Sequence, residues 1–402
     1  MRLDNCLACG GSELATYAML GKQALANSFT EEPEDNRKTY DLSVRVCGDC
    51  WHSQLLYAVP PEVLYKHYLY ESGTAKSHIE HFKDLAKHAS NLTISKIFKS
   101  SVLDIGCNNG TLLKEFERFD WFDTFQGVDP AENINCPYPV LRDFWDENTW
   151  YKLDDSYDIV CGLNVFAHNI NPYGFLKGVK KVMPEWGSLI LEFPLWTNSF
   201  RLPDIGQIYH EHYNYFTTSS FVSLLERVGN LKIEEVRHFP NMHGGTVRFV
   251  VRVSNDPHCL EVRHMMRAEA DMREASSYGN FQGTINKQAL DLADEVDRFK
   301  SEGYKVVAYG ASAKSSVLLQ FSKRLAGAVD YIVDDAPMKI NTFSPAGNIP
   351  VKPTSELLKE SDKTVVLCTA HNFFADIKER LHNMGFHGKI LSYLPELKSE
   401  DV

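Results

Sequence analysis

Short apolar runs alternate with helical patterns over two long stretches of the chain, which is typical of α/β domains with largely parallel sheets. In the first stretch, the runs predict strands at 101–106, 125–129, 157–164 and 187–194, and the motif 242–250 should close the domain with a further strand. In the second stretch, they predict strands at 305–310, 330–333, 349–351 and 365–368. Residues 256–300 are charged and helical, so we expect a connector between the two stretches.

This pattern divides the chain into three parts, which its 402 residues are long enough to form. We expect residues 1–70 to form a small N-terminal module and residues 71–255 to form a doubly wound α/β domain. Residues 256–402 should contain the connector and a second, Rossmann-like α/β domain.

Composition and charge restrict the class of protein. Hydrophobic residues make up 44% of the chain and charged residues 24%, as in ordinary globular proteins. No apolar run approaches the roughly 20 residues of a membrane helix, and the N-terminus lacks the apolar core of a secretory signal. We therefore expect a cytoplasmic protein with no membrane partner. The formal charge of −11 argues against a nucleic-acid partner, because such binding neutralises phosphates with Lys and Arg.

Four of the nine cysteines form two C-x2-C pairs, Cys6 with Cys9 and Cys47 with Cys50. Four thiolates complete the tetrahedral coordination of Zn²⁺ and leave no open position. The pairs therefore predict a structural zinc site rather than a catalytic one. The alternatives are a redox dithiol or unrelated buried cysteines.

The apolar run at 101–106 ends in a glycine turn that opens a helix at 107–113. Such a turn lets the backbone approach a nucleotide closely. The spacing is not G-x-G-x-x-G and the turn has no phosphate-binding Lys, so a dinucleotide site and a P-loop both fit poorly. Asp129 ends the next strand, where an acid accepts hydrogen bonds from a ribose diol.

Residues 207–216 concentrate groups that transfer protons: two histidines, a carboxylate and three tyrosines. His168 follows the predicted strand at 157–164, at the sheet edge where open α/β sheets bind ligands. We expect an active site formed by these two segments. The alternative is a polar loop whose tyrosines fill a neighbouring core.

The strand at 305–310 is followed by alanines, serines and a lysine at 311–316, and these should start a helix. A helix N-terminus of this kind is a plausible diphosphate seat. The next strand again ends in acids, the first of them Asp334. The alternative is a domain whose residues serve only packing.

The turn 104–110, with Asp129 after the next strand, resembles the class I methyltransferases that bind S-adenosylmethionine. The whole chain resembles the nucleotide-sugar C-methyltransferases of the deoxysugar pathways. That resemblance rests on the cysteine pairs and on the segments 104–110, 207–212, 243–245, 309–314, 334–335 and 349–351. It implies a class I methyltransferase doubly wound sheet, flanked by a zinc module and a C-terminal Rossmann-like domain. We expect a monomer or a weak homo-oligomer.

The resemblance also implies roles for individual residues. The donor S-adenosylmethionine would be bound by Asp104, Gly106, Asn108, Gly110, Asp129, Asp143, Phe144 and Asn164. The active site would be lined by Tyr70, His168, Tyr209, Glu211 and His212. The nucleotide-sugar substrate would be bound by His243, Gly244, Tyr309, Ser312, Lys314, Ser315 and Asp334. The zinc ligands would be Cys6, Cys9, Cys47 and Cys50.

The implied reaction methylates the carbon next to the ketone of a nucleotide-linked 4-keto-6-deoxyhexose. That carbon becomes nucleophilic only after it loses a proton, and a histidine with a pKa near neutrality is a suitable base. We expect His212 to be the base, with Glu211 as the competing candidate. A tyrosine and a second histidine can stabilise the enolate oxygen. The alternatives are an O- or N-methyltransferase and a non-catalytic zinc-containing binding protein.

Overall fold

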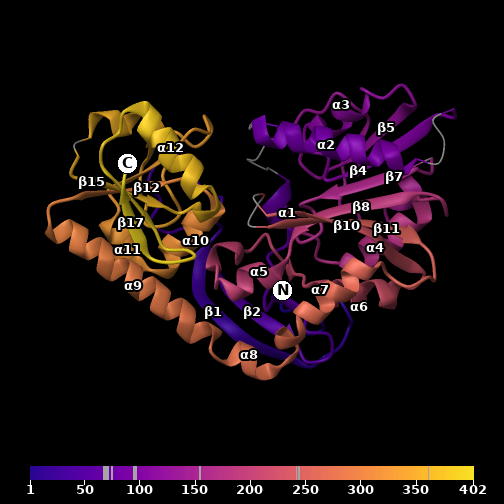
Figure 1. Ribbon diagram of the computed structural model, residues 1–402, viewed down its shortest axis with the longest axis horizontal. Helices are drawn as coiled ribbons and strands as arrows, with labels where there is room; N and C mark the ends of the chain where they lie inside the picture. Colours follow the sequence, from indigo (N-terminus) through magenta and orange to yellow (C-terminus); the bar gives the residue numbers. More distant parts are fainter. Residues whose placement is uncertain are drawn as a thin grey trace.

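The computed structural model describes residues 1–66, 72–73, 76–93, 97–153, 155–240, 242, 245–360 and 362–402. Its strands form three sheets in three parts of the molecule (Figure 1). The central domain and the C-terminal domain lie side by side, and the N-terminal module lies below and between them in this view. Three of the predicted site residues lie outside the described residues: Tyr70, His243 and Gly244.

The first sheet has four antiparallel strands in the order β1-β2-β3-β9. Three strands come from the N-terminal module: β1 (Leu14–Ala24), β2 (Thr39–Cys47) and β3 (Ser53–Leu55), followed by helix α1 (Pro61–Tyr65). The fourth, β9 (Asn214–Tyr215), comes from the proton-transfer stretch 207–216 and pairs with β3. That stretch is thus an edge of the N-terminal sheet.

The second sheet has seven strands in the order β10-β11-β8-β7-β4-β5-β6. They are β4 (Ser100–Ile105), β5 (Phe122–Val128), β6 (Val140–Leu141), β7 (Ile159–Leu163), β8 (Ser188–Pro194), β10 (Leu231–Phe239) and β11 (Thr246–Val253). Strand β11 is inserted between β8 and β10 and runs antiparallel to both. Strand β4 pairs with both β5 and β7, so the strand order reverses there and creates the crevice where open α/β sheets bind ligands.

Helices cover both faces of this sheet, so its strands are apolar on both sides. On one face, side chains of α2 (Lys76–Leu92) and α3 (Thr111–Phe116) pack against alternate strand residues such as Val102 and Ile159. On the other, α4 (Pro172–Val182) and α6 (Thr218–Val228) pack against Leu103 and Val160. The short helix α5 (Trp196–Arg201) follows β8. In the described part of the chain, no helix combines the length and apolar character needed to span a bilayer.

The third sheet has six strands in the order β14-β13-β12-β15-β16-β17, of which only β17 is antiparallel to its neighbour. They are β12 (Lys305–Tyr309), β13 (Tyr331–Asp334), β14 (Val351–Pro353), β15 (Thr364–Cys368), β16 (Lys389–Ser392) and β17 (Lys398–Asp401). Its helices are α10 (Ala313–Phe321), α11 (Lys323–Ala328) and α12 (Phe374–Met384).

The predicted connector at 256–300 is helical, and its two ends belong to different domains. Helix α7 (Leu260–Ala268) buries Val262 in the core of the central domain. After α8 (Ala275–Gly279), the long helix α9 (Phe281–Ser301) buries its apolar face against the C-terminal sheet and the N-terminal module. Figure 1 shows α9 running along the lower edge of both.

Candidate active site

A cavity of about 1760 Å³ lies where the three parts meet. Loops that follow strands of both parallel sheets line it, together with residues of the stretch 207–212. Most of the described residues predicted for the site line this cavity: Asp104, Gly106, Asn108, Asp129, Asp143, Phe144, Asn164, His168, Tyr209, Glu211, His212, Ser312, Lys314 and Asp334. The sheet edge, the proton-transfer stretch and the C-terminal loops therefore share one space.

The turn after β4 has the geometry of a nucleotide-binding loop. Gly106 has a φ of 80°, and a Cβ atom there would lie 3.1 Å from the side chain of Val165, so only glycine fits. Asp129 Oδ2 accepts a hydrogen bond from the backbone N–H of Asn108 at 2.8 Å, and its Oδ1 accepts one from Ala131 at 2.8 Å. A carboxylate has about four acceptor sites, so this one retains capacity for a ribose diol. The loop therefore fits the methyl donor, S-adenosylmethionine.

Four other residues predicted to bind S-adenosylmethionine have distinct positions. Asp143 accepts a hydrogen bond from the backbone N–H of Phe144 and pairs with Lys152, and all three side chains line the cavity. Asn164 ends β7 in a left-handed conformation, with a φ of 53°. Gly110 is the N-cap of α3 and does not line the cavity, so any contribution it makes is through the backbone.

Asp104, at the end of β4, is buried but lines the cavity. Burial, and then the charge of Asp129, raise the pKa of this carboxyl to about 7. A cation bound in the cavity would favour the ionised form and lower that pKa again.

This gives a prediction for the pH dependence of donor binding. S-adenosylmethionine carries a net positive charge, whereas S-adenosylhomocysteine has lost the sulfonium charge. The affinity for S-adenosylmethionine should be constant above pH about 7 and fall below it by up to about tenfold per pH unit, because Asp104 must then release a proton. Calorimetric titrations between pH 5.5 and 8 should show this slope for S-adenosylmethionine and a smaller one for S-adenosylhomocysteine. Equal slopes, or an unchanged slope in Asp104→Asn, would refute the assignment.

His212 is held at both ring nitrogens. Its Nδ1 lies 2.9 Å from the carbonyl oxygen of Gln207, which can only accept, so Nδ1 carries a proton. Its Nε2 lies 2.7 Å from the hydroxyl of Tyr209. Burial and then the charge of Glu211 hold the pKa of Tyr209 well above 10, so its O–H donates to Nε2. The backbone carbonyl of Gln207 thus fixes the tautomer of His212.

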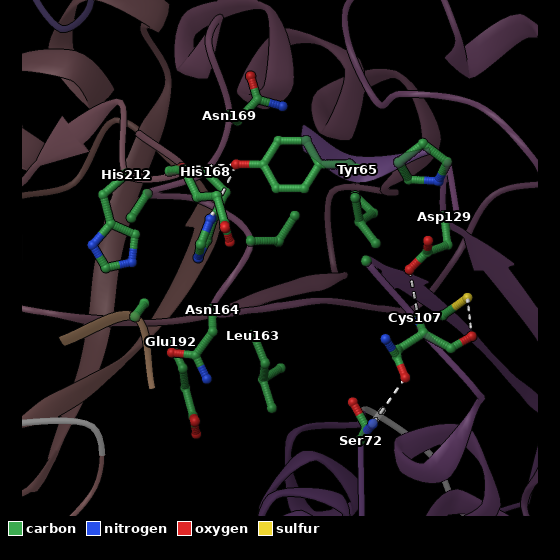
Figure 2. A pocket seen from close by; sticks show the side chains of 18 of the residues that line it. Tyr65, Ser72, Cys107, Asp129, Leu163, Asn164, His168, Asn169, Glu192 and His212 are labelled. Atoms are coloured by element: carbon green, nitrogen blue, oxygen red, sulfur yellow. Dashed lines mark hydrogen bonds between the residues drawn. The ribbon is translucent and has the colours of Figure 1, made fainter. Parts of the chain in front are cut away.

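His168 lies against His212, with 4.6 Å between the ring centroids. Its Nδ1 is 3.2 Å from the hydroxyl of Tyr65, which donates a 2.7 Å hydrogen bond to the backbone oxygen of Glu211. Figure 2 shows the two histidines on one side of the view and Asp129 and Cys107 on the other, with Tyr65 between them and its hydroxyl toward His168. Tyr65 was missed because tyrosines on an aromatic connector more often serve packing.

Glu211 points toward the N-terminal module. Its Oε1 accepts a 2.7 Å hydrogen bond from the side chain of Asn27, which also lines the cavity and which no sequence motif indicated. Lys339 is a second cavity residue that was missed, and its ammonium donates to the Ala311 carbonyl at 2.7 Å. Burial lowers the pKa of Lys339, and the charges of Asp334 and Glu211 oppose that effect. His210, in contrast, turns its ring toward the Tyr40 carbonyl and does not line the cavity.

Two edges of the cavity are formed by loops that follow parallel strands. The donor edge contains Asp129 and the turn after β4, and the C-terminal edge contains Asp334 and the start of α10. The C-terminal edge repeats the hydrogen bonding of the donor edge. Asp334 is the last residue of β13. Its Oδ2 accepts from the N–H of Ala311 at 2.7 Å, and its Oδ1 accepts from the N–H of Ala336 at 2.8 Å. Ser312 caps α10 by accepting from the N–H of Ser315. Tyr309 and Ser315, both predicted to bind substrate, are buried and do not line the cavity.

The four paired cysteines are brought together as a possible metal site. Their sulfur atoms all lie within 4.8 Å of one another, and the pairs Cys6–Cys50 and Cys9–Cys47 are 3.6 Å apart. A Zn²⁺ with four bonds of about 2.3 Å needs sulfurs about 3.8 Å apart, so zinc fits. Both ring nitrogens of nearby His52 contact other side chains, Ser220 and Asn214, so His52 is a neighbour of the site.

Three family models match the chain in succession: a zinc binding domain over residues 6–65, a methyltransferase domain over 77–235, and a C-methyltransferase C-terminal domain over 241–395. The C-methyltransferase NovU of Streptomyces niveus is 26% identical over 369 residues, which cover 87% of this chain and 85% of NovU. The tRNA U34 carboxymethyltransferase of Nautilia profundicola is 28% identical over 100 residues, or 23% of this chain and 33% of that protein.

Among solved structures, the plantazolicin methyltransferase BpumL in complex with SAH is 13% identical, with a TM-score of 0.35 over 45% of this chain and 86% of that chain. The three successive domain matches, the relative that spans most of the chain, and the strand order and cysteine cluster described above indicate the same class of enzyme. The chain is an S-adenosylmethionine-dependent methyltransferase, similar to C-methyltransferases in its domain matches, with a structural zinc site in its N-terminal module.

Proposed function

We propose that the enzyme methylates a nucleotide-linked keto-deoxysugar at the carbon next to its ketone. The arrangement of His212 carries this proposal. Because Nδ1 is committed to the Gln207 carbonyl, only Nε2 can accept a proton, and it belongs to a cavity shared by the donor edge and the C-terminal edge. A buried, tautomer-fixed imidazole beside such a space is suited to take a proton from carbon.

In the proposed step, the α-proton of the ketone moves to Nε2 of His212. The electron pair of the C–H bond forms the enolate. The Tyr209 hydroxyl, which donates to Nε2 in this structure, turns to donate to the enolate oxygen. We assign the sugar hydroxyls to His168 and Tyr65, which line the cavity beside His212, and assign the same role to Tyr70. S-adenosylmethionine supplies the methyl group as a sulfonium electrophile.

We assign Asp104, Asp129 and the turn after β4 to the donor, with Asp143 and Phe144 at its adenine. The nucleotide of the substrate then belongs to the C-terminal edge, where Asp334 repeats the hydrogen bonds of Asp129. The start of α10 offers backbone N–H groups, and Lys314 and Lys339 offer charge for a diphosphate. His243 and Gly244 complete the proposed substrate set.

A panel of nucleotide-linked keto-sugars with labelled S-adenosylmethionine tests this function. We expect one or more sugars to gain a methyl group on carbon, identified by mass and NMR. We also expect deuterium from D₂O to enter that carbon without the donor, because enolate formation precedes transfer. Methyl groups on oxygen or nitrogen without such exchange would establish an O- or N-methyltransferase. Binding without any transfer would contradict an enzymatic role toward these sugars.

A further inference from the structure

Asp204 joins the central domain to the C-terminal domain through one buried carboxylate. Its side chain is 2% exposed. Its Oδ2 lies 3.2 Å from the ammonium of Lys314, on α10, and 3.6 Å from Nε2 of His371, after β15. Burial lowers the pKa of His371, so Lys314 provides the positive charge opposite Asp204 near neutral pH.

The other oxygen of Asp204 organises the backbone that leads to the base. Its Oδ1 accepts a 3.0 Å hydrogen bond from the N–H of Gly206 and caps the 3-10 turn Ile205–Gln207. The last residue of that turn supplies the carbonyl that holds Nδ1 of His212. One carboxylate thus contacts the lysine of the C-terminal edge and the turn that fixes the tautomer of the base.

Close packing makes this connection stiff. Gly206 lies so near Lys314 that a Cβ atom on the glycine would be 2.9 Å from Cβ of the lysine. The lysine stem therefore rests directly on the turn, and neither can move without the other. Lys314 is also the second residue of α10, at the helix N-terminus that faces the cavity.

We propose that Asp204 is a positioning residue that couples the nucleotide seat of the C-terminal domain to His212. The coupling rests on the proposed function in one respect, that a diphosphate occupies this seat. A bound diphosphate shares the Lys314 ammonium with Asp204 and draws α10 onto the turn Ile205–Gln207. The turn then presents the Gln207 carbonyl to His212 in the geometry that leaves Nε2 as the basic nitrogen.

Asp204→Asn tests the coupling because it removes the charge and retains the size of the side chain. We expect kcat and the α-proton exchange rate to fall together by about 10- to 100-fold, as when a reacting group is displaced by a fraction of an ångström. The Kd for S-adenosylmethionine should not change, and KM for the nucleotide sugar should rise by less than about threefold. Gly206→Ala, which keeps every charge and displaces Lys314, should reproduce the loss.

Asp330→Asn is the matched control. Asp330 also binds a lysine ammonium, Lys300 at 3.1 Å, and a backbone N–H, that of Val306 at 2.9 Å, but it lies outside the cavity. It should leave kcat and exchange unchanged. A rise in KM alone in Asp204→Asn would overturn the coupling, as would kcat and exchange rates equal to those of the control.

A second readout needs no substrate. The His212 signals in ¹⁵N-histidine spectra are assigned by comparison with the spectrum of His212→Gln. In such spectra, Asp204→Asn and Gly206→Ala should each lower the population of the Nδ1–H tautomer of His212. Unchanged spectra in both variants would overturn the coupling. If the wild-type enzyme acts on no keto-sugar, the proposed function fails, while the spectra still decide whether Asp204 positions His212.

Discussion

His212→Gln should abolish exchange of the substrate α-proton with D₂O and slow methyl transfer by at least about 10³-fold. Loss of a positioned base costs about 10²–10⁴ in rate, and the hydrogen bond from Nδ1 of this imidazole to the Gln207 carbonyl leaves its acceptor lone pair on Nε2. Binding of S-adenosylmethionine should persist, because Asp129 and the turn after β4 are untouched. NMR of the α-carbon and calorimetry of the donor measure the two effects separately.

His210→Gln is the matched control for that experiment. His210 is two residues away and is also buried, yet its ring faces the Tyr40 carbonyl outside the cavity. We expect it to keep the exchange rate within a few-fold of wild type. Glu211→Gln distinguishes the remaining candidate: if it alone abolishes exchange while His212→Gln does not, Glu211 is the base.

Removal of zinc should inactivate the enzyme, although none of the four cysteines lines the cavity. The four sulfurs join the chain ahead of β1 to the end of β2, and β3 in that sheet pairs with β9. Structural zinc contributes apparent binding energies of about 10–16 kcal/mol in small domains, comparable to the whole stability of a typical domain. The zinc-free module should therefore unfold and release β9, together with Glu211 and His212 just before it.

Cys47→Ser and chelation should both give this result, with zinc content followed by mass spectrometry and the N-terminal sheet by hydrogen exchange. Cys259→Ser is the control, because Cys259 is a partly exposed cysteine outside the cluster. It should retain zinc and activity. Full activity in protein shown to be zinc-free would disprove the structural dependence.

Local patterns predicted most strands of the two largely parallel sheets, because a strand buried on both faces is an apolar run whatever its partners, but they did not predict β6, β10, β16 and β17. The turn after β4 and Asp129 were also predicted from local patterns, because both are recognised from the residues next to them in the sequence. Strand β9 could not be predicted this way. Asn214 and Tyr215 pair with Gln54 and Ser53, from which most of the sequence of the central domain separates them. No local pattern encodes that pairing.

The sequence does contain a pattern that could have indicated one group of cavity residues that was missed. Glu192 and Arg248 are single charges within apolar strand runs, and the structure pairs them directly across β8 and β11. His81 of α2 lies 2.6 Å from the same carboxylate, and both His81 and Glu192 line the cavity. Burial of the Glu192 carboxyl would raise its pKa, but His81 and Arg248 together hold that pKa below its ordinary value. An isolated charge in a strand of a doubly covered sheet therefore indicates a buried partner.

The position of β9 has a consequence for hybrid enzymes. All six strands of the C-terminal sheet come from residues 305–401, so a relative's C-terminal domain can be grafted at a single junction. Such a graft would exchange the proposed nucleotide seat and keep the base, provided that Asp204 still meets a lysine like Lys314. A graft of the N-terminal module would instead replace the strand partner of β9, and with it Asn27 and Tyr65. Substrate preference should therefore be transferable from the C-terminal side, whereas the N-terminal module and the stretch 207–216 must be inherited together.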